Sequence, residues 1–170
     1  MTKTMNEKLN EVNSTAEEIE NITNEIVDTY CSRLDDCMKF IGDVIYDEKN
    51  PITDAELESL SLALPNLLYF VNSASESLGI KEDIAKAFKT NKYNSFFLEQ
   101  DGKIADKTVK ADLLIQDETL IHLCYQRAYK RVKNKVEAGF EMLNSVKKVL
   151  SKRMLDIRLT AENSGKVIDD

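Results

Sequence analysis

Apolar residues recur every three or four positions along most of the chain, which is the spacing of one face of an α-helix. The first such run extends from Ile19 to Ile45. It predicts a helix over 15–47 that starts at a capping-box pattern over 14–17. The polar residues 1–13 are predicted to form a flexible N-terminus.

The middle of the chain continues the helical pattern but carries several helix breakers. A second capping box at Thr53 predicts the start of another helix. Pro65 predicts a kink or a short break in that helix, and Gly79 predicts its end. A third helix is expected over 81–98, and Asp-Gly at Gly102 predicts the turn that follows it.

The longest pattern lies over about 108–160, where only Gly139 interrupts the run of helix-forming residues. It predicts a last helix over 117–158, followed by a flexible tail over 161–170. A straight helix of this length would measure roughly 60 Å, so it should either fold back on itself or pack against copies of the chain. The stripe expected to form the core or an oligomer contact consists of Ile121, Tyr125, Val132, Val136, Leu143 and Leu150.

Composition supports an all-α class, because 170 residues contain only five glycines and two prolines. We expect one helical domain over 14–160, a long-helix bundle with a coiled-coil-like C-terminal helix or a helical hairpin, in an oligomer. No apolar run is long enough to span a membrane, and the polar N-terminus does not resemble a secretory signal. These features predict a cytoplasmic protein without a membrane partner.

The formal net charge of −7 hides a strong polarity along the chain. Residues 1–60 hold 5 basic and 15 acidic residues, a net of −10, whereas residues 126–158 hold 10 and 3, a net of +7. Such asymmetry suggests a polyanion partner for the basic helix. The acidic and basic helices could equally pair with each other, and the sequence leaves both interpretations open.

Catalytic and metal-binding patterns are missing from the sequence. Cys31, Cys37 and Cys124 form no CxxC motif, and His122 is the only histidine, so we expect neither a disulfide framework nor a metal site. The isolated glycines exclude a phosphate-binding loop. The sequence therefore predicts a binding or assembly protein without catalytic residues or a cofactor, and not an enzyme.

The basic last helix is the main functional feature of the sequence. Several of its cations fall opposite the apolar stripe on a helical wheel, where they could contact phosphates or simply form a solvated face. Tyr125, Tyr129 and Phe140 are interleaved with them and could stack on bases or belong to the core. The predicted nucleic-acid-binding residues are Arg127, Lys130, Arg131, Lys147, Lys148, Lys152, Arg153 and Arg158.

The C-terminal half resembles UvsY-like recombination mediators of T-even-type phages. The resemblance extends over 107–114, 117–121, 125–143 and 146–158, and includes a basic-hydrophobic run at 152–158. It implies a ring-like homo-oligomer in the host-cell cytoplasm that binds single-stranded DNA. Such a protein helps a RecA-like recombinase to replace a single-strand-binding protein, without enzymatic activity. From the matching run, the resemblance implies DNA contacts for Lys152, Arg153 and Arg158.

Two other functions remain open at this point. The acidic first helix, which has no counterpart in the family, could belong to an interaction protein of phage origin that inhibits or sequesters a host or defence factor. Alternatively, the long helices could form a structural coiled-coil assembly with no affinity for nucleic acid.

Overall fold

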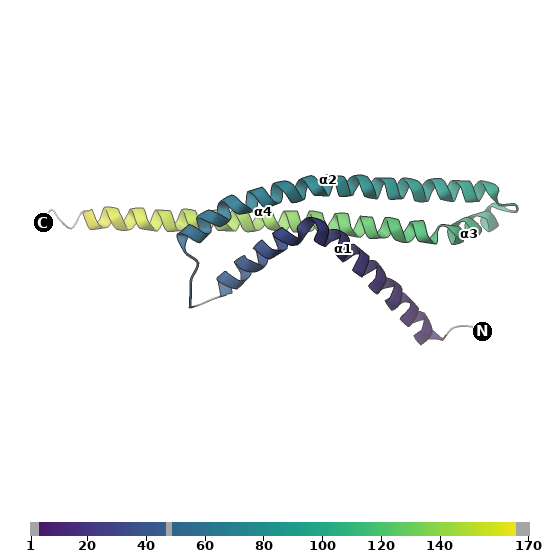
Figure 1. The fold of residues 1–170 in the computed structure, drawn as a ribbon, viewed down its shortest axis with the longest axis horizontal. Helices are drawn as coiled ribbons and strands as arrows, with labels where there is room; N and C mark the ends of the chain where they lie inside the picture. The colour runs from purple at the N-terminus through teal and green to yellow at the C-terminus, as the bar shows by residue number, and fades with distance from the viewer. Residues whose placement is uncertain (1–3, 47–48, 166–170) are drawn as a thin grey trace. The chain divides into compact units, whose positions relative to one another are not determined.

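The computed structural model describes residues 4–46 and 49–165, and within these ranges the protein is all-α. Helices cover 93% of the described residues, and no strand occurs among them. This confirms the predicted fold class. The four helices found in these ranges are α1 (Met5–Tyr46), α2 (Asp54–Glu99), α3 (Ile104–Leu114) and α4 (Gln116–Gly165) (Figure 1).

The described helices form two compact units, and the single domain expected over 14–160 stays a prediction. Unit 1 consists of Met1–Cys31 and Ser73–Lys133, and unit 2 consists of Ser32–Asn72 and Asn134–Asp170. The helices α1, α2 and α4 each contribute residues to both units. Each unit therefore builds its own core from helix segments that are distant in sequence.

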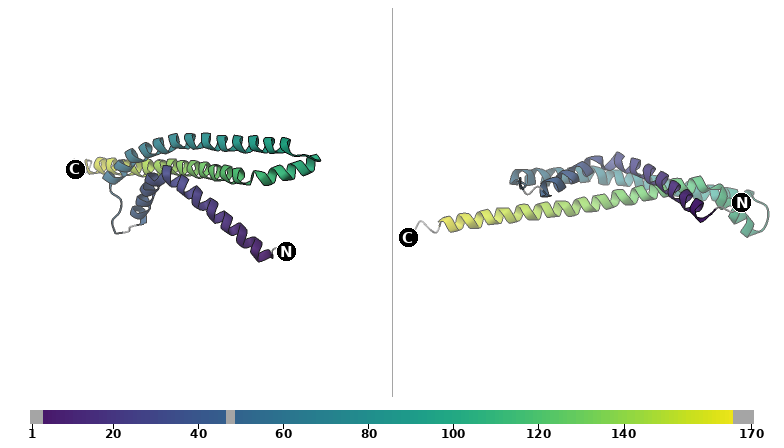
Figure 2. Two further views of the ribbon diagram at one scale, coloured as in Figure 1. Left: turned by 45° about the vertical axis from the view of Figure 1, so that its right-hand side comes forward. Right: turned by 90° about the horizontal axis from the view of Figure 1, so that it is seen from below.

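Unit 1 packs the first part of α1, the last part of α2, α3 and the first part of α4. The chain reverses after α2, so that α3 and the start of α4 run antiparallel to the end of α2 (Figures 1 and 2). Its buried apolar side chains come from all four helices and from Ile115, which follows α3. A buried side chain as large as leucine contributes about 1.5–3 kcal/mol to stability. The core includes Val27, Cys31, Leu78, Ala85, Ala111, Ile115, Cys124, Ala128 and Val132.

Unit 2 packs the second part of α1, the first part of α2 and the second part of α4. Gly139 of α4 lies next to buried leucines of both other segments. A Cβ atom at this position would lie 2.5 Å from Leu68 Cδ2 and 3.6 Å from Leu34 Cδ1, so glycine leaves room for both leucines. The core includes Leu34, Ile41, Leu57, Leu60, Leu64, Leu68, Val71, Val136, Leu143 and Val146.

The first helix begins ten residues earlier than the sequence pattern predicted. A capping box at Thr4 starts it: the Thr4 N–H donates to Glu7 Oε2 (2.7 Å), and the Glu7 N–H donates to Thr4 Oγ1 (3.3 Å). Ser14 lies inside the helix, so its predicted role as N-cap is wrong. The predicted flexible segment 1–13 is helical from Met5 onward, because no glycine or proline interrupts it.

The second helix is continuous through both of its predicted breaks. Thr53 caps it as predicted, since the Thr53 N–H donates to Glu56 Oε2 (2.8 Å). Pro65 lies between turns anchored by the buried Leu64 and Leu68, and the packing of these side chains maintains the helix. Gly79 does not end it either. The predicted helix over 81–98 is therefore the end of α2.

The remaining helix boundaries lie after the end of α2. Gly102 adopts the positive φ of +119° that the predicted turn requires, and α3 follows it. Ile115 (φ −109°, ψ 22°) separates α3 from α4 and lies before the predicted last helix over 117–158. The fold-back that was one alternative for this helix does not occur. From Gln116 onward α4 is one uninterrupted helix. The predicted tail 161–170 is helical to Gly165, and its remaining residues lie outside the described ranges.

Candidate nucleic-acid interface

One side of α4 faces the cores, as the apolar spacing requires. Its stripe residues nevertheless differ in burial, and the exposed member belongs to unit 1. Val132, Val136 and Leu143 are buried, Tyr125 and Leu150 are half-buried, and Ile121 is exposed. The stripe thus serves as core in its middle, while its first residue remains open to solvent.

The end of α4 in unit 2 carries a group of unpaired cations. Lys147, Lys148, Lys152 and Arg158 are exposed, and none forms a hydrogen bond or ion pair with another residue of the described ranges. All residues over 154–162 are exposed as well, since α4 extends beyond the first turn of α2 (Figure 2). We call these four residues the basic end of α4. Their charges are available to a ligand at no cost in internal contacts.

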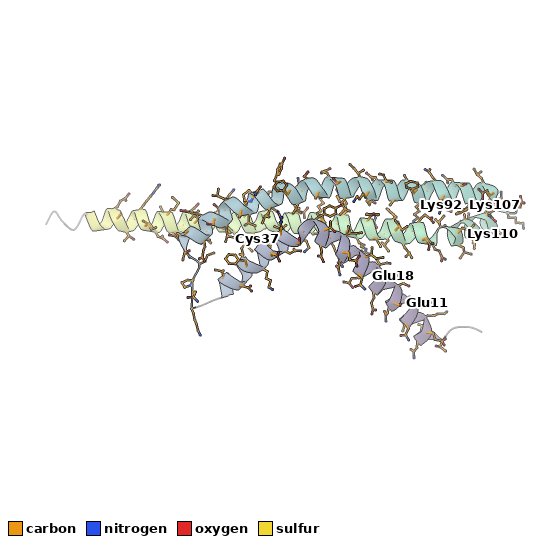
Figure 3. All side chains as sticks on the ribbon, in the orientation of Figure 1. Glu11, Glu18, Cys37, Lys92, Lys107 and Lys110 are labelled. Atoms are coloured by element: carbon orange, nitrogen blue, oxygen red, sulfur yellow. The ribbon has the colours of Figure 1, made fainter. Side chains whose placement is uncertain are left out.

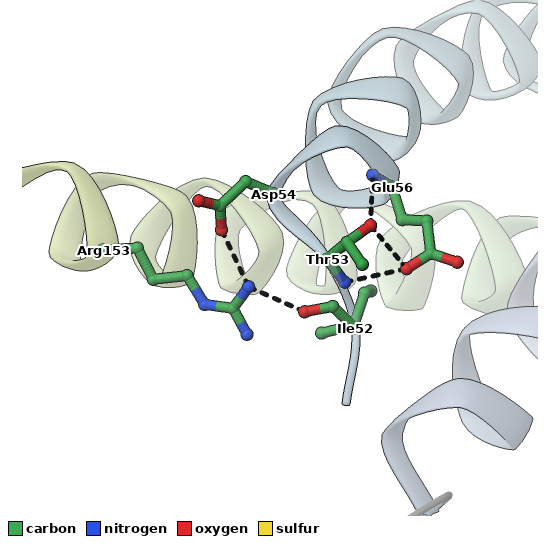
Figure 4. A network of polar contacts seen from close by, with 5 residues as sticks. All are labelled: Ile52, Thr53, Asp54, Glu56 and Arg153. Atoms are coloured by element: carbon green, nitrogen blue, oxygen red, sulfur yellow. Dashed lines mark hydrogen bonds and ion pairs between the residues drawn. The ribbon is translucent and has the colours of Figure 1, made fainter. Parts of the chain in front are cut away.

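Arg153 lies between these cations in sequence but has a different environment. Its Nη1 donates to the carbonyl oxygen of Ile52 (2.7 Å) and to Asp54 Oδ1 (2.8 Å), as Figure 4 shows. Both partners lie at the start of α2, next to the capping box of Thr53 and Glu56. Arg153 therefore fastens the end of α4 to the beginning of α2, and its guanidinium is already engaged.

The cations of α4 in unit 1 also divide into free and paired groups. Arg127 and Lys130 are exposed, with no ion pair among the described residues. Arg131, in contrast, donates to Asn24 Oδ1 and lies 3.5 Å from Glu20 Oε1, both on α1. Exposed pairs of this kind contribute little to stability, with a median of about 0–1 kcal/mol.

These contacts show how far the acidic and basic helices pair within each unit. Unit 1 has the Arg131–Glu20 pair, and unit 2 has Lys135 Nζ at 2.5 Å from Asp35 Oδ1. Both pairs join α4 to α1. The basic end of α4 has no such carboxylate partner among the described residues, so its charge is not neutralised by α1.

Of the three aromatic residues interleaved with the cations, Phe140 is the most open. Tyr125 and Tyr129 are half-buried, and the Tyr129 ring packs against Gly79, where an added Cβ would lie 3.3 Å from Cε2. Phe140 is 47% exposed. On an ideal helix Phe140, Lys147 and Arg158 lie within about 20° of one another, so an exposed ring and two cations share one face in unit 2.

The only histidine is engaged, and two of the three cysteines are buried. His122 Nε2 lies 2.9 Å from Glu82 Oε1, and this pair is only slightly exposed. Cys31 and Cys124 are buried, and burial raises the pKa values of the Cys37 and Cys124 thiols. A raised pKa favours the unreactive thiol form. Within the described ranges, no group of three or more His, Cys, Asp or Glu side chains is placed to hold a metal ion.

The sequence could not reveal which cations are engaged. Arg153 and Asp54 are 99 residues apart, and Arg131 and Glu20 are 111 residues apart. No local spacing connects such partners, so all eight cations looked equivalent in the sequence. The available signal was weaker and concerned Arg153 alone, which lies at an edge of the apolar stripe, where a side chain can reach a neighbouring helix.

Among the described residues, no helix is both long enough and apolar enough to cross a membrane. The chain matches no family model, no curated protein and no solved structure.

Proposed function

We propose that this protein is a non-enzymatic mediator of phage-type DNA recombination that binds single-stranded DNA through the basic end of α4. One observation carries the proposal: four exposed cations on the last part of α4 have no hydrogen-bond or ion-pair partner among the described residues. The resemblance of the C-terminal half to UvsY-like mediators supports the assignment to recombination. In that role the protein assists the loading of a RecA-like recombinase onto DNA covered by a single-strand-binding protein.

The electrostatics of this segment suit a phosphate backbone. Residues 147–158 contain five cations and one carboxylate, a local net charge of +4 in a chain whose total is −7. Each Lys or Arg that neutralises a phosphate releases condensed counterions, which favours binding at low salt. Four such contacts on single-stranded DNA give a slope of log K against log salt of about −3.

The exposed ring of Phe140 favours single strands over duplex DNA. Bases of a single strand can stack on an aromatic side chain, and such stacking contributes about 1–3 kcal/mol per base. In duplex DNA the bases already stack on one another and are not accessible to this ring. Phe140 on the same face as Lys147 and Arg158 is therefore suited to an unpaired strand.

The proposal includes self-association of the chain. A single protomer offers a short row of phosphate contacts, which alone gives weak binding. Copies that bind one strand together raise the effective affinity without new types of contact. A homo-oligomer also follows from the resemblance to the mediator family.

The binding proposal is tested by fluorescence anisotropy with a labelled single-stranded oligonucleotide at low salt. The double variant Lys148→Glu/Lys152→Glu should bind at least about tenfold more weakly than the unchanged chain. The matched control is Lys103→Glu/Lys110→Glu, which changes the net charge equally at two exposed lysines beside and within α3 (Lys110 in Figure 3). Equal losses in both variants would show that only total charge matters and would contradict the proposed interface.

The recombinase role is tested separately. A RecA-like recombinase should assemble faster on strand covered by single-strand-binding protein when the unchanged chain is added. The Lys148→Glu/Lys152→Glu variant should lose this acceleration, because loading depends on holding the strand. Acceleration that is equal for both chains would exclude a mediator role through the basic end of α4.

A further inference from the structure

The beginning of α1 presents an apolar stripe to solvent. Met5, Leu9 and Val12 are 74%, 52% and 63% exposed, and their spacing of four and three places them on one face of the helix. Ala16 continues this face and is also exposed. Farther along α1 the same face is buried, at Thr23 and Val27. We call Met5, Leu9, Val12 and Ala16 the α1 stripe.

Unit 1 also contains an open apolar groove of about 370 Å³ between α2 and α4. Its walls are formed by Ile84 and Phe88 of α2 and by Ile121 and Tyr125 of α4. Phe88 is 66% exposed, and Ile121 is the member of the predicted core stripe that remained open. We call this feature the α2–α4 groove. An open apolar groove between two helices suits the apolar face of a third helix.

Lysines line the rim of the α2–α4 groove. Lys81 Nζ donates to the Tyr30 hydroxyl oxygen (3.0 Å), and Lys92 is paired with Glu118. The α2 segment 81–92, from which Lys81 and Lys92 line the groove, has a net charge of +2, and Glu118 of α4 adds one carboxylate to the lining. A partner with an acidic helix is therefore favoured at this rim.

The start of α1 has the complementary charge. Residues 5–20 contain five glutamates and one lysine, a net charge of −4. Glu11 and Glu18 lie on this part of α1 (Figure 3). Two α1 stripes from different copies would bring these like charges together, which disfavours direct pairing of α1 with α1. The same helix placed in the lysine-rimmed groove brings opposite charges together.

We propose that two copies of the chain associate reciprocally, with the α1 stripe of each lying in the α2–α4 groove of the other. The lengths agree, because residues 5–16 and residues 81–92 are both about 18 Å long as helices. A reciprocal contact of this kind closes as a two-fold dimer and leaves no free copy of either surface. This inference names the surfaces for the self-association in the proposed function and rests on that part of the proposal. The α1 stripe and the α2–α4 groove include neither the basic end of α4 nor a DNA contact.

The first test is size-exclusion chromatography with light scattering on the full chain without DNA. The unchanged protein should have about twice the 19.3 kDa chain mass, whereas Val12→Glu and Phe88→Glu should each be monomers. Leu98→Glu is the matched control, since Leu98 is exposed on α2 but lies outside the groove, and it should remain dimeric. Circular dichroism should show unchanged helix content in all three variants, because the substituted side chains are exposed.

A mixing experiment tests the reciprocal arrangement itself. Val12→Glu retains an intact groove, and Phe88→Glu retains an intact α1 stripe. A mixture of the two variants should therefore form a 1:1 dimer through one intact contact, at concentrations where each variant alone is monomeric. A mixture that remains monomeric would overturn the proposal. So would dimers of the Val12→Glu or Phe88→Glu variant alone, because they would show that the copies meet through another surface.

The same samples separate this inference from the proposed function. An unchanged chain that is monomeric but binds single-stranded DNA would overturn the dimer and leave the DNA interface intact. A dimer that fails to bind single-stranded DNA at low salt would overturn the proposed function and leave the dimer intact. Val12→Glu should still bind DNA, with an affinity reduced by the loss of avidity.

Discussion

Lys152 and Arg153 are adjacent in sequence, yet the structure gives them different roles. Lys152 is exposed and forms no hydrogen bond or ion pair with another residue of the described ranges. Arg153 donates from Nη1 to the carbonyl oxygen of Ile52 and to Asp54. The 100° between neighbouring residues on a helix is sufficient to separate a ligand-facing cation from a structural one.

This difference gives a first prediction. Arg153→Ala should lower the free energy of unfolding by about 1 kcal/mol, because hydrogen bonds to a charged and partly exposed group are lost. The affinity of this variant for single-stranded DNA should remain nearly unchanged. Lys152→Ala should have the opposite pattern, with unchanged stability and weaker binding. Urea unfolding and anisotropy titrations on both variants measure this, and matching profiles for the two would contradict the assigned roles.

A second prediction at the residue scale concerns Glu56. Hydrogen bonds from the Thr53 backbone N–H and then from its hydroxyl lower the pKa of the Glu56 carboxyl below its usual value of about 4.3. A depressed pKa in the folded state stabilises the protein above the unfolded-state pKa. This stabilisation is lost as the pH falls through the folded-state pKa.

The measurement is urea unfolding between about pH 2 and pH 6, below and above the usual pKa of a glutamate. Glu56→Gln keeps a capping acceptor but cannot titrate, so its stability relative to the unchanged chain should be lowest above pH 5 and should recover as the pH falls. Glu58→Gln, at an exposed neighbour, is the control. A constant difference between Glu56→Gln and the unchanged chain would contradict the role of the charged cap.

At the scale of helices, the apolar spacing predicted the class and most helical segments, but not where they end. Pro65 and Gly79 predicted interruptions that α2 does not contain. Inside a helix, glycine lowers helix stability by about 1 kcal/mol and proline by about 3 kcal/mol relative to alanine. The burial of Leu64, Leu68 and Leu78 offsets these costs through packing, which no local pattern in the sequence reveals.

The sequence contains two capping-box patterns at which α1 could begin. Both Thr4 and Ser14 begin a pattern with glutamate three residues later. The structure uses the first, because the intervening residues form helix without a breaker.

The basic end of α4 was predicted with the other cations, whereas the engagement of Arg131 and Arg153 depends on partners about a hundred residues away.

Helix packing gives a third prediction, from two glycines in comparable helical positions. At Gly42 no atom lies within 4 Å of an added Cβ, so Gly42→Ala should raise the free energy of unfolding by about 0.5–1 kcal/mol. At Gly139 the added atom meets the buried Leu68, and overpacking costs about 1–3 kcal/mol. Gly139→Ala should therefore be destabilising. Equal stabilisation of both variants in urea unfolding would contradict the close approach in unit 2.

At the scale of the whole molecule, α1 is part of both cores. Val27 and Cys31 are buried in unit 1, and Leu34 and Ile41 are buried in unit 2. Removing residues 1–50 would expose both cores at a cost comparable to the usual total stability of about 5–15 kcal/mol. Such a truncation cannot separate a function of the acidic helix from loss of folding.

A fourth prediction follows from this arrangement. Deletion of residues 1–50 should abolish the cooperative thermal transition in circular dichroism. Deletion of residues 1–13 should preserve a cooperative transition, because residues 4–14 are exposed and belong to neither core. Its midpoint should fall only as far as the loss of the proposed dimer lowers stability. If the longer deletion unfolded cooperatively at the original temperature, the assignment of α1 to both cores would be wrong.

Net charge belongs to this scale as well. The chain carries −7 in total, with −10 in residues 1–60, so long-range repulsion opposes the approach of DNA. Binding then depends on close contact at the basic end of α4, where α1 supplies no carboxylate partner among the described residues. Salt weakens close contacts to phosphates through counterion uptake, which makes salt dependence the most direct probe of this interface.

DNA binding through the basic end of α4 is tested by titrating the protein with a single-stranded oligonucleotide at a series of salt concentrations. The unchanged chain should bind at low salt, with log K falling against log salt at a slope of about −3. Replacing Lys147, Lys148, Lys152 and Arg158 together by glutamine should bring the slope close to zero and abolish most of the affinity. Absence of binding at low salt, or a slope that the four substitutions leave unchanged, would contradict DNA binding through the basic end of α4.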